Sequence, residues 1–308
     1  MGTVPDLSVE IAGIVFPNPV VLASGTVGYG EEFEGLIDFS RVGGIAVKGT
    51  SLQPLEGNPP PRLFPTPSGM LNAIGLQNVG VDRFIQEKMP FLRRAGCQVI
   101  VNVFGFTVAE YVAVVERLNA CDGVAAYELN VSCPNTEQGG MIFGTDARTA
   151  ADLVGRVRAK ARRPLIVKLS PNVTDIREIA RAVEAAGADA LTVANTYLAM
   201  AIDTATFRPR LDNVTGGLSG PAIRPITLRM VYECAGAVRI PIFGLGGIAS
   251  GADAVEYLLA GATAVQVGTA HFRDPHASLR VVDELRAFLE RRGIGRVGDI
   301  VGKMERSS

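Results

Sequence analysis

One cysteine and several amide and amine side chains stand at positions where they could do chemistry. Residues 127–135 have the sequence YELNVSCPN, in which an apolar run ends at Asn130 and Cys133 directly precedes Pro134. The residue before a proline is biased away from helix, so Cys133 is expected in a loop beside the end of a buried strand. A lone cysteine is more often a small hydrophobic filler. A loop rich in Pro, Asn and Gly instead favours an acid/base role for Cys133.

Other polar residues also follow short apolar runs, the pattern of strands that are buried on both faces. Taken alone, an Asn in this position is usually a turn residue and a Lys is usually a solvated charge. Five amide or amine side chains at strand ends are harder to explain in that way. The runs end at Ser24, Lys48, Asn102, Asn130, Lys168, Asn195, Gly246 with Gly247, and Gly268 with Thr269.

These strand ends need a scaffold that brings them together. Eight apolar runs alternate with stretches of helical periodicity, which is the pattern of a (β/α)8 barrel, although an open doubly wound sheet shares the same rhythm. In a barrel the carboxyl ends of all strands meet at one mouth, where active sites lie. Helices are predicted over residues 82–94, 109–118, 147–161, 222–238 and 275–291, with one more that Thr174 caps and another that begins with the capping-box pair Ser250 and Asp253.

Three segments lie outside this rhythm. Residues 7–17 alternate polar and apolar side chains, which predicts a small N-terminal hairpin. Residues 54–69 are too rich in Pro and Gly for a regular element, and residues 196–220 form a long loop of the kind that is usually functional. Because no linker-like stretch divides the chain, residues 1–308 are expected to form one domain.

The glycine-containing strand ends indicate an anion site. Gly246 and Gly247 precede a capped helix, and Gly268 follows the last strand, where barrels commonly bind phosphate. The alternative is that these glycines only make tight turns. Residues 244–249 also fit the dinucleotide pattern G-x-G-x-x-A, but Gln266 stands where that pattern expects an acid.

Few other side chains could transfer a proton. The two histidines, His271 and His276, both follow the last strand, and a structural role is expected for His271. Glu128 lies on the same face of its strand as Asn130, because side chains alternate along a strand. Glu128 could pair with Lys168 inside the barrel or be a satisfied buried charge, and the sequence leaves both open.

Composition excludes several classes of function. The chain has 308 residues, is 47% hydrophobic and has a formal net charge of −1, so it has no basic surface for nucleic acid or anionic lipid. We see no signal peptide and no apolar run of the roughly 20 residues that a membrane helix needs, which predicts a cytoplasmic protein. Its four cysteines, Cys97, Cys121, Cys133 and Cys234, are scattered, so no zinc site or iron–sulfur cluster is expected.

Taken together, these motifs resemble a known family. Residues 130–135 (NVSCPN), followed by Gly139 and Gly140, resemble the catalytic loop of the class 1 dihydroorotate dehydrogenases. Residues 72–78 (NAIGLQN) look like the substrate loop of class 1B, the NAD-linked type. The resemblance covers nearly the whole chain. Class 2 enzymes use a serine base and carry an N-terminal membrane segment, and the substrate loop of class 1A normally differs.

The resemblance implies an FMN-containing barrel that oxidises dihydroorotate to orotate in the synthesis of UMP. It implies that Cys133 removes the C5 proton while a hydride leaves C6 for N5 of FMN. The implied flavin contacts are Ser24, Lys48, Gly49, Asn102, Asn130, Lys168, Ala194, Gly220, Gly246, Gly247, Gly268 and Thr269. The implied substrate contacts are Lys48, Asn72, Ala73, Ile74, Gly75, Leu76, Asn130, Asn195 and Thr196.

The resemblance also implies partners. A class 1B catalytic subunit forms a homodimer within a heterotetramer, whose second subunit carries FAD and a [2Fe–2S] cluster and reduces NAD+. A class 1A-like homodimer with another electron acceptor is an alternative, as is a flavin enzyme of the dihydropyrimidine dehydrogenase type. A non-redox phosphate-binding barrel and an inactive interaction subunit are the remaining hypotheses.

Overall fold

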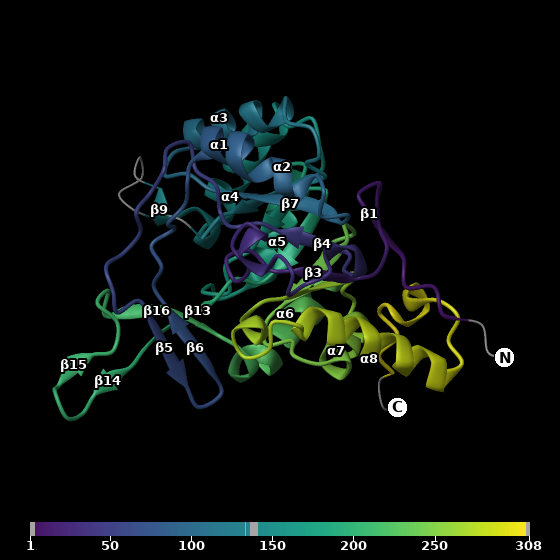
Figure 1. Cartoon of the computed structure of the whole chain (residues 1–308). Helices are drawn as coiled ribbons and strands as arrows, with labels where there is room; N and C mark the ends of the chain where they lie inside the picture. Colours follow the sequence, from purple (N-terminus) through teal and green to yellow (C-terminus); the bar gives the residue numbers. More distant parts are fainter. Residues whose placement is uncertain (1–3, 133, 136–140, 306–308) are drawn as a thin grey trace.

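The fold is a closed barrel of eight parallel strands (Figure 1), seen in a computed structural model that describes residues 4–132, 134–135 and 141–305. The strands follow each other around the barrel in chain order, and the last pairs with the first. The predicted barrel is therefore confirmed, and the open doubly wound sheet is wrong. The barrel strands are β3 (Val20–Leu22), β4 (Gly44–Ala46), β7 (Gln98–Val103), β8 (Ala126–Asn130), β11 (Leu165–Lys168), β12 (Ala190–Val193), β17 (Ile242–Leu245) and β18 (Ala264–Val267).

Helices cover the outside of the barrel (Figure 1). The predicted helix over residues 82–94 is present, but a π-helical turn at Phe84–Lys88 separates its two short α-helical parts. No helix in the described part of the chain is long and apolar enough to cross a bilayer. The helices are α1 (Val81–Arg83), α2 (Met89–Leu92), α3 (Val108–Asn119), α4 (Ala147–Arg158), α5 (Ile176–Ala185), α6 (Arg224–Ala235), α7 (Gly251–Leu259) and α8 (Ala277–Arg292).

Two helix caps show how local sequence sets the helix starts. The capping box predicted for α7 is confirmed, since the side chain of Ser250 accepts from Asp253 N and the Asp253 side chain accepts from Ser250 N. The predicted Thr174 cap is wrong. Asp175 is the N-cap of α5, and its carboxylate accepts from Arg177 N. An aspartate carboxylate is at least as good a cap as a threonine hydroxyl.

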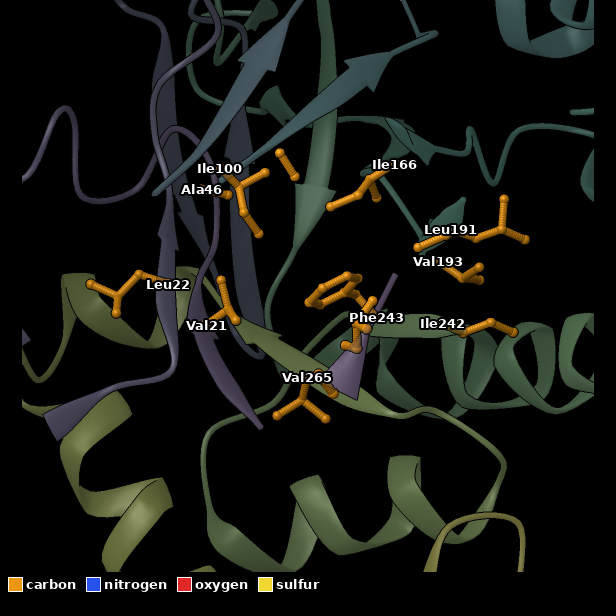
Figure 2. Packing of buried hydrophobic residues seen from close by; sticks show 14 of the residues in the cluster. Val21, Leu22, Ala46, Ile100, Ile166, Leu191, Val193, Ile242, Phe243 and Val265 are labelled. Atoms are coloured by element: carbon orange, nitrogen blue, oxygen red, sulfur yellow. The ribbon is translucent and has the colours of Figure 1, made fainter. Parts of the chain in front are cut away.

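Apolar side chains fill the closed end of the barrel. Because residues alternate along each strand, Val21, Ile100 and Ile166 point inward, while Leu22 and Leu191 point toward the helices (Figure 2). The ring of Phe243 lies among the inward-pointing side chains and meets Phe16 of the N-terminal hairpin edge-to-face, with 5.8 Å between the ring centroids. The predicted hairpin, β1 (Val9–Ile11) and β2 (Ile14–Phe16), thus closes the bottom of the barrel.

A four-stranded antiparallel sheet stands at the opposite end (Figure 1). It consists of β5 (Leu63–Thr66), β6 (Gly69–Asn72), β16 (Thr215–Ser219) and β13 (Tyr197–Met200). The expectation that residues 54–69 contain no regular element is therefore wrong. Residues 196–220 are likewise more than a loop, because they also contain the small hairpin β14 (Ile202–Asp203) and β15 (Arg208–Pro209). The pairing of β16 with β6 joins segments that are far apart in the sequence, so no local sequence pattern predicts it.

We expect Phe243→Ala to lower the free energy of unfolding by about 3–5 kcal/mol, because the ring is fully buried and its removal leaves a cavity. Urea denaturation measures this change. The matched control is Phe272→Ala, whose ring is 51% exposed and should change the stability by less than about 0.5 kcal/mol. Equal effects of the two substitutions would show that the barrel interior is not the stabilising core.

Candidate active site

A cavity of about 1390 Å3 lies between the barrel mouth and the four-stranded sheet. It collects side chains from the strand ends and from the sheet, although these are far apart in sequence. Every described residue that the sequence assigned to a cofactor or a substrate lines this cavity. They are Ser24, Lys48, Gly49, Asn72, Ala73, Ile74, Gly75, Leu76, Asn102, Asn130, Lys168, Ala194, Asn195, Thr196, Gly220, Gly246, Gly247, Gly268 and Thr269.

One side of the cavity is built from backbone N–H groups. Those of Gly246, Gly247 and Gly268 donate no hydrogen bond to any described residue. Gly247 has φ of +68°, and a Cβ there would lie 2.7 Å from the carbonyl oxygen of Gly220, so only glycine fits. Free N–H groups in such a turn form a concave site for an anion.

The N-terminus of α7 contributes less to this anion site than the sequence predicted. The Asp253 carboxylate accepts from the N–H groups of Ala249 and Ser250, and Glu284 accepts from Gly251 N at 2.6 Å. Two carboxylates of the protein therefore already balance the positive end of the helix. The loop amides, rather than the helix end, remain as donors.

Amide side chains form a hydrogen-bonded group in the middle of the cavity. Asn195 Nδ2 donates to Asn130 Oδ1 at 3.1 Å and to Ser132 Oγ at 3.0 Å, and Asn195 Oδ1 accepts from Thr196 N. The Tyr111 hydroxyl group donates a hydrogen bond to the backbone carbonyl oxygen of Asn130 at 2.6 Å. These contacts fix the two amide planes, so that they present defined donors and acceptors to a planar ligand.

Residues 72–76 line another wall of the cavity, and contacts with Asn58 hold them in place. Gly75 has φ of +71°, and a Cβ at Gly75 would collide with the backbone nitrogen of Asn58. The Asn58 side chain in turn donates to Ala73 O at 3.0 Å. Asn58 N donates to Ile74 O and Ala73 N donates to Arg62 O, so the protein holds this stretch of backbone along the cavity wall.

Two cationic groups line this part of the cavity. Burial lowers the pKa of Lys48, and the nearby positive charge of Arg62 lowers it further. Arg62 itself donates to Gln77 Oε1 at 2.7 Å. Two neighbouring cations that repel each other form a favourable site for a carboxylate. Arg62 was not predicted from the sequence, because nothing in the Pro-rich segment indicated the strand β5 that follows it.

Four further polar residues, which were not predicted from the sequence, also line the cavity: Ser132, Ser170, Asn172 and Ser219. Ser132 lies within the NVSCPN motif, and Ser219 Oγ accepts from Thr269 Oγ1 at 2.8 Å. Ser170 and Asn172 follow β11 closely, so their position two and four residues after Lys168 was the signal that could have found them. The Asn172 side chain also bonds within the protein, since its Nδ2 donates to Thr196 O and its Oδ1 accepts from Leu198 N.

Cys133, Gly139 and Gly140 lie outside the residues that the structure describes. The three described thiols are poor candidates for proton transfer. Burial raises the pKa of Cys97 and that of Cys234 to about 12, and it also raises the pKa of Cys121. Among the described residues no group of three or more His, Cys, Asp or Glu side chains could hold a metal ion.

His271 has the structural role expected from the sequence. It is buried, its Nδ1 lies 3.0 Å from Gly268 O, and its Nε2 lies 2.8 Å from Ser278 Oγ. Burial lowers the pKa of His271 to about 4, so the ring is neutral at pH 7. A neutral ring that donates from Nδ1 and accepts at Nε2 satisfies both contacts and holds Gly268 in place at the cavity.

Comparisons with known proteins agree with this geometry. Residues 6–289 match the family model described as dihydroorotate dehydrogenase. The chain is 54% identical to the dihydroorotate dehydrogenase B (NAD(+)) catalytic subunit of Geotalea uraniireducens, over 97% of this chain and 98% of the relative. It is 56% identical to the protein of the same name from Geobacter sulfurreducens, over 98% and 99%.

Two further matches widen this group. A relative from Solibacter usitatus, 54% identical over 98% of this chain and 99% of its own, carries the provisional name dihydroorotate dehydrogenase A (fumarate). A solved structure of the Eimeria tenella enzyme in complex with ferulenol matches with a TM-score of 0.79 at 26% identity, covering 97% of this chain and 88% of the other. The names of the relatives thus agree on the oxidised substrate and differ in the electron acceptor.

We expect the stability of the protein to fall as the pH is lowered from about 6.5 through about 4. The folded pKa of His271 lies below its ordinary value of 6.5, so the unfolded chain takes up the proton first, and the loss reaches about 3 kcal/mol. Urea denaturation across this pH range measures it. His271→Asn should flatten the slope, while the control His276→Asn, at an exposed position, should keep it. Parallel slopes in all three proteins would contradict this role.

Proposed function

The chain belongs to the dihydroorotate dehydrogenase family, and we propose that it oxidises dihydroorotate to orotate, with FMN and the substrate bound together in the barrel-mouth cavity. The observation that carries the proposal is the convergence of three kinds of group on one cavity: free glycine N–H groups, paired amides and buried cations. Each kind matches a different part of a flavin and a pyrimidine carboxylate. Orotate formation serves the synthesis of UMP.

The residues present fit FMN. The free N–H groups of Gly246, Gly247 and Gly268 would hold its phosphate, with Gly220 and Thr269 beside them. Lys168, Asn102 and the remaining assigned residues would contact the ring system. When bound, FMN supplies a two-electron acceptor for the hydride from C6 of the substrate.

The substrate would lie between the amide group and the loop at residues 72–76. A dihydropyrimidine ring presents alternating N–H and C=O groups, which the amides of Asn72, Asn130 and Asn195 can match as donors and acceptors. Lys48 would bind the carboxylate, together with the backbone at Gly75, which lines the same cavity. The positive charge that Arg62 adds near Lys48 favours an anionic ligand there.

Cys133 is proposed as the base that removes the proton from C5. This proton is α to a carbonyl, so a modest base suffices where hydrogen bonds stabilise the developing enolate. The high pKa values of Cys97 and Cys234 exclude them from this role at neutral pH. A free thiol has a pKa of about 8.5, so we propose that the rate rises with pH through a thiol ionisation.

The electron acceptor and the assembly are part of the proposal. We propose that residues 1–308 form one catalytic subunit that works in the cytoplasm and passes electrons to a partner subunit with FAD and [2Fe–2S], which reduces NAD+. The name "catalytic subunit" of the relatives supports such a partner. Apolar side chains on the outer sheet and its hairpin, Leu198, Met200, Ile202 and Phe207, are exposed and support a homodimer through this surface.

The proposed reaction predicts rapid bleaching of bound flavin when dihydroorotate is added to the anaerobic protein. Stopped-flow absorbance measures this half-reaction without the electron acceptor. Dihydrouracil, which lacks the carboxylate, should bleach the flavin far more slowly. Bleaching by dihydrouracil alone would instead favour a dihydropyrimidine dehydrogenase, and a colourless protein without flavin would favour a non-redox barrel.

We expect Cys133→Ala to bind FMN normally and to reduce it about 10²- to 10⁴-fold more slowly, which is the range typical of general base catalysis. Stopped-flow reduction by dihydroorotate measures the rate. The matched control is Cys97→Ala, which removes a buried thiol whose pKa is about 12 and should leave the rate unchanged. An unchanged rate in Cys133→Ala would remove this residue from the mechanism.

A further inference from the structure

A carboxylate is buried inside the barrel directly below the cavity, and the proposed reaction does not use it. Glu128 is fully buried on β8. It accepts hydrogen bonds from Asn102 Nδ2 at 2.7 Å, from Thr192 Oγ1 at 2.7 Å and from Gln266 Nε2 at 2.8 Å. These donors come from three other strands of the barrel, so the whole polar layer is organised around this one side chain.

The polar neighbours of Glu128 are arranged as donors to its carboxyl group. All three neighbours donate to Glu128, and a carboxylate only accepts. Gln266 turns its Nε2 toward Glu128 although its own Oε1 is thereby left buried without a partner among the described residues. Hydrogen bonds from three donors favour the negatively charged form of a carboxyl group.

Lys168 lies on the neighbouring strand β11, where it pairs with Asn130, two residues beyond Glu128. It stands opposite Thr192 in the register of β11 and β12, and Thr192 is bonded to Glu128. Lys168 is buried except where it lines the cavity, and its amino group has no hydrogen-bond partner among the described residues. Burial lowers the pKa of Lys168, while the charge of Glu128 raises it. The two effects oppose each other at the floor of the cavity.

We propose that Glu128 is a positioning residue that keeps Lys168 protonated, so that the floor of the cavity presents a positive charge to the reduced flavin. This rests on the proposed function in one respect, namely that FMN occupies the cavity. An ammonium group near the flavin ring stabilises the negative charge of its reduced form and raises its reduction potential. A buried lysine alone would tend to lose its proton, and the buried carboxylate prevents this.

The groups around Lys168 show which of them could keep its amino group protonated. On the adjacent strand β12 Lys168 pairs with Thr192, which has no titratable group in this range, and on β8 it pairs with Asn130, two residues beyond Glu128. Lys48 lines the same cavity from the end of β4, and His271 is neutral at pH 7. Of the charged groups described, Glu128 is the one whose charge acts appreciably on Lys168.

The test is the midpoint potential of bound FMN in Glu128→Gln, measured against a reference dye over a range of pH. At alkaline pH we expect the equilibrium constant for flavin reduction to fall about tenfold or more, or about 30 mV for a two-electron couple, because Lys168 releases its proton. On acidification Lys168 regains the proton, and the deficit should disappear. A potential that rises at every pH would show that Lys168 stays charged without Glu128. An unchanged potential would show that the carboxylate is only structural.

Two controls separate charge from packing. Thr192→Val removes one hydrogen bond to Glu128 but keeps its charge, so the potential should remain that of the wild type. In a Lys168→Met background, adding Glu128→Gln should no longer lower the potential, because the proposed effect passes through Lys168. A full decrease in that background would overturn the proposal.

Two further results keep the proposal testable. If Glu128→Gln does not retain FMN, Glu128→Asp moves the charge away by one methylene group and should give a smaller decrease in the same direction, and an unchanged potential there would overturn the proposal. Absence of FMN from the wild-type protein would instead refute the proposed function itself. Failure of the two ideas is therefore distinguishable.

Discussion

The parallel pairing of eight short strands is the constraint on which the site depends. Parallel strands in a closed barrel share one direction, so the residue that follows each strand arrives at the same mouth. The strand registers place Lys168 beside Asn130 on one side and beside Thr192 on the other. Groups that are scattered over more than 240 residues, from Ser24 to Thr269, thereby line one cavity.

Burial of charge inside this barrel gives the cavity its chemical character. Glu128 lies in the interior with three donors, and Lys48 and Lys168 lie at the mouth with lowered pKa values. Each charge costs free energy to remove from water, so it persists only where hydrogen bonds or an opposite charge offset that cost. The two lysines therefore lie at the open end of the barrel, where an anionic cofactor or substrate can pair with their positive charges.

Much of this could be predicted from the sequence, because a strand buried on both faces is a continuous apolar run and its polar end is easy to recognise. Lys48, Asn102 and Lys168 were found in this way, and the cavity contains all three. The outer sheet could not be found, because β6 pairs with β16 across 145 residues and its strands contain glycine and proline. No local pattern reports such a pairing.

The anion site, too, could be predicted from the sequence only in part. The glycines at the ends of β17 and β18 were correctly placed at the cavity, but the free helix end beside them was not, since Glu284 reaches Gly251 N from α8. Only the tertiary structure shows that a carboxylate from a distant helix already occupies that end. Cys133 remains a prediction from its motif, because the described residues do not include it.

A crystal structure of the purified protein with orotate tests the central claim most directly. We expect one FMN per chain, with its phosphate on the N–H groups of Gly246, Gly247 and Gly268 and with Lys168 beside the ring. We also expect orotate on the face of the flavin that points away from the barrel interior, in contact with Lys48, Asn72, Asn130 and Asn195. Orotate bound elsewhere, or a phosphate held away from these glycines, would contradict the account.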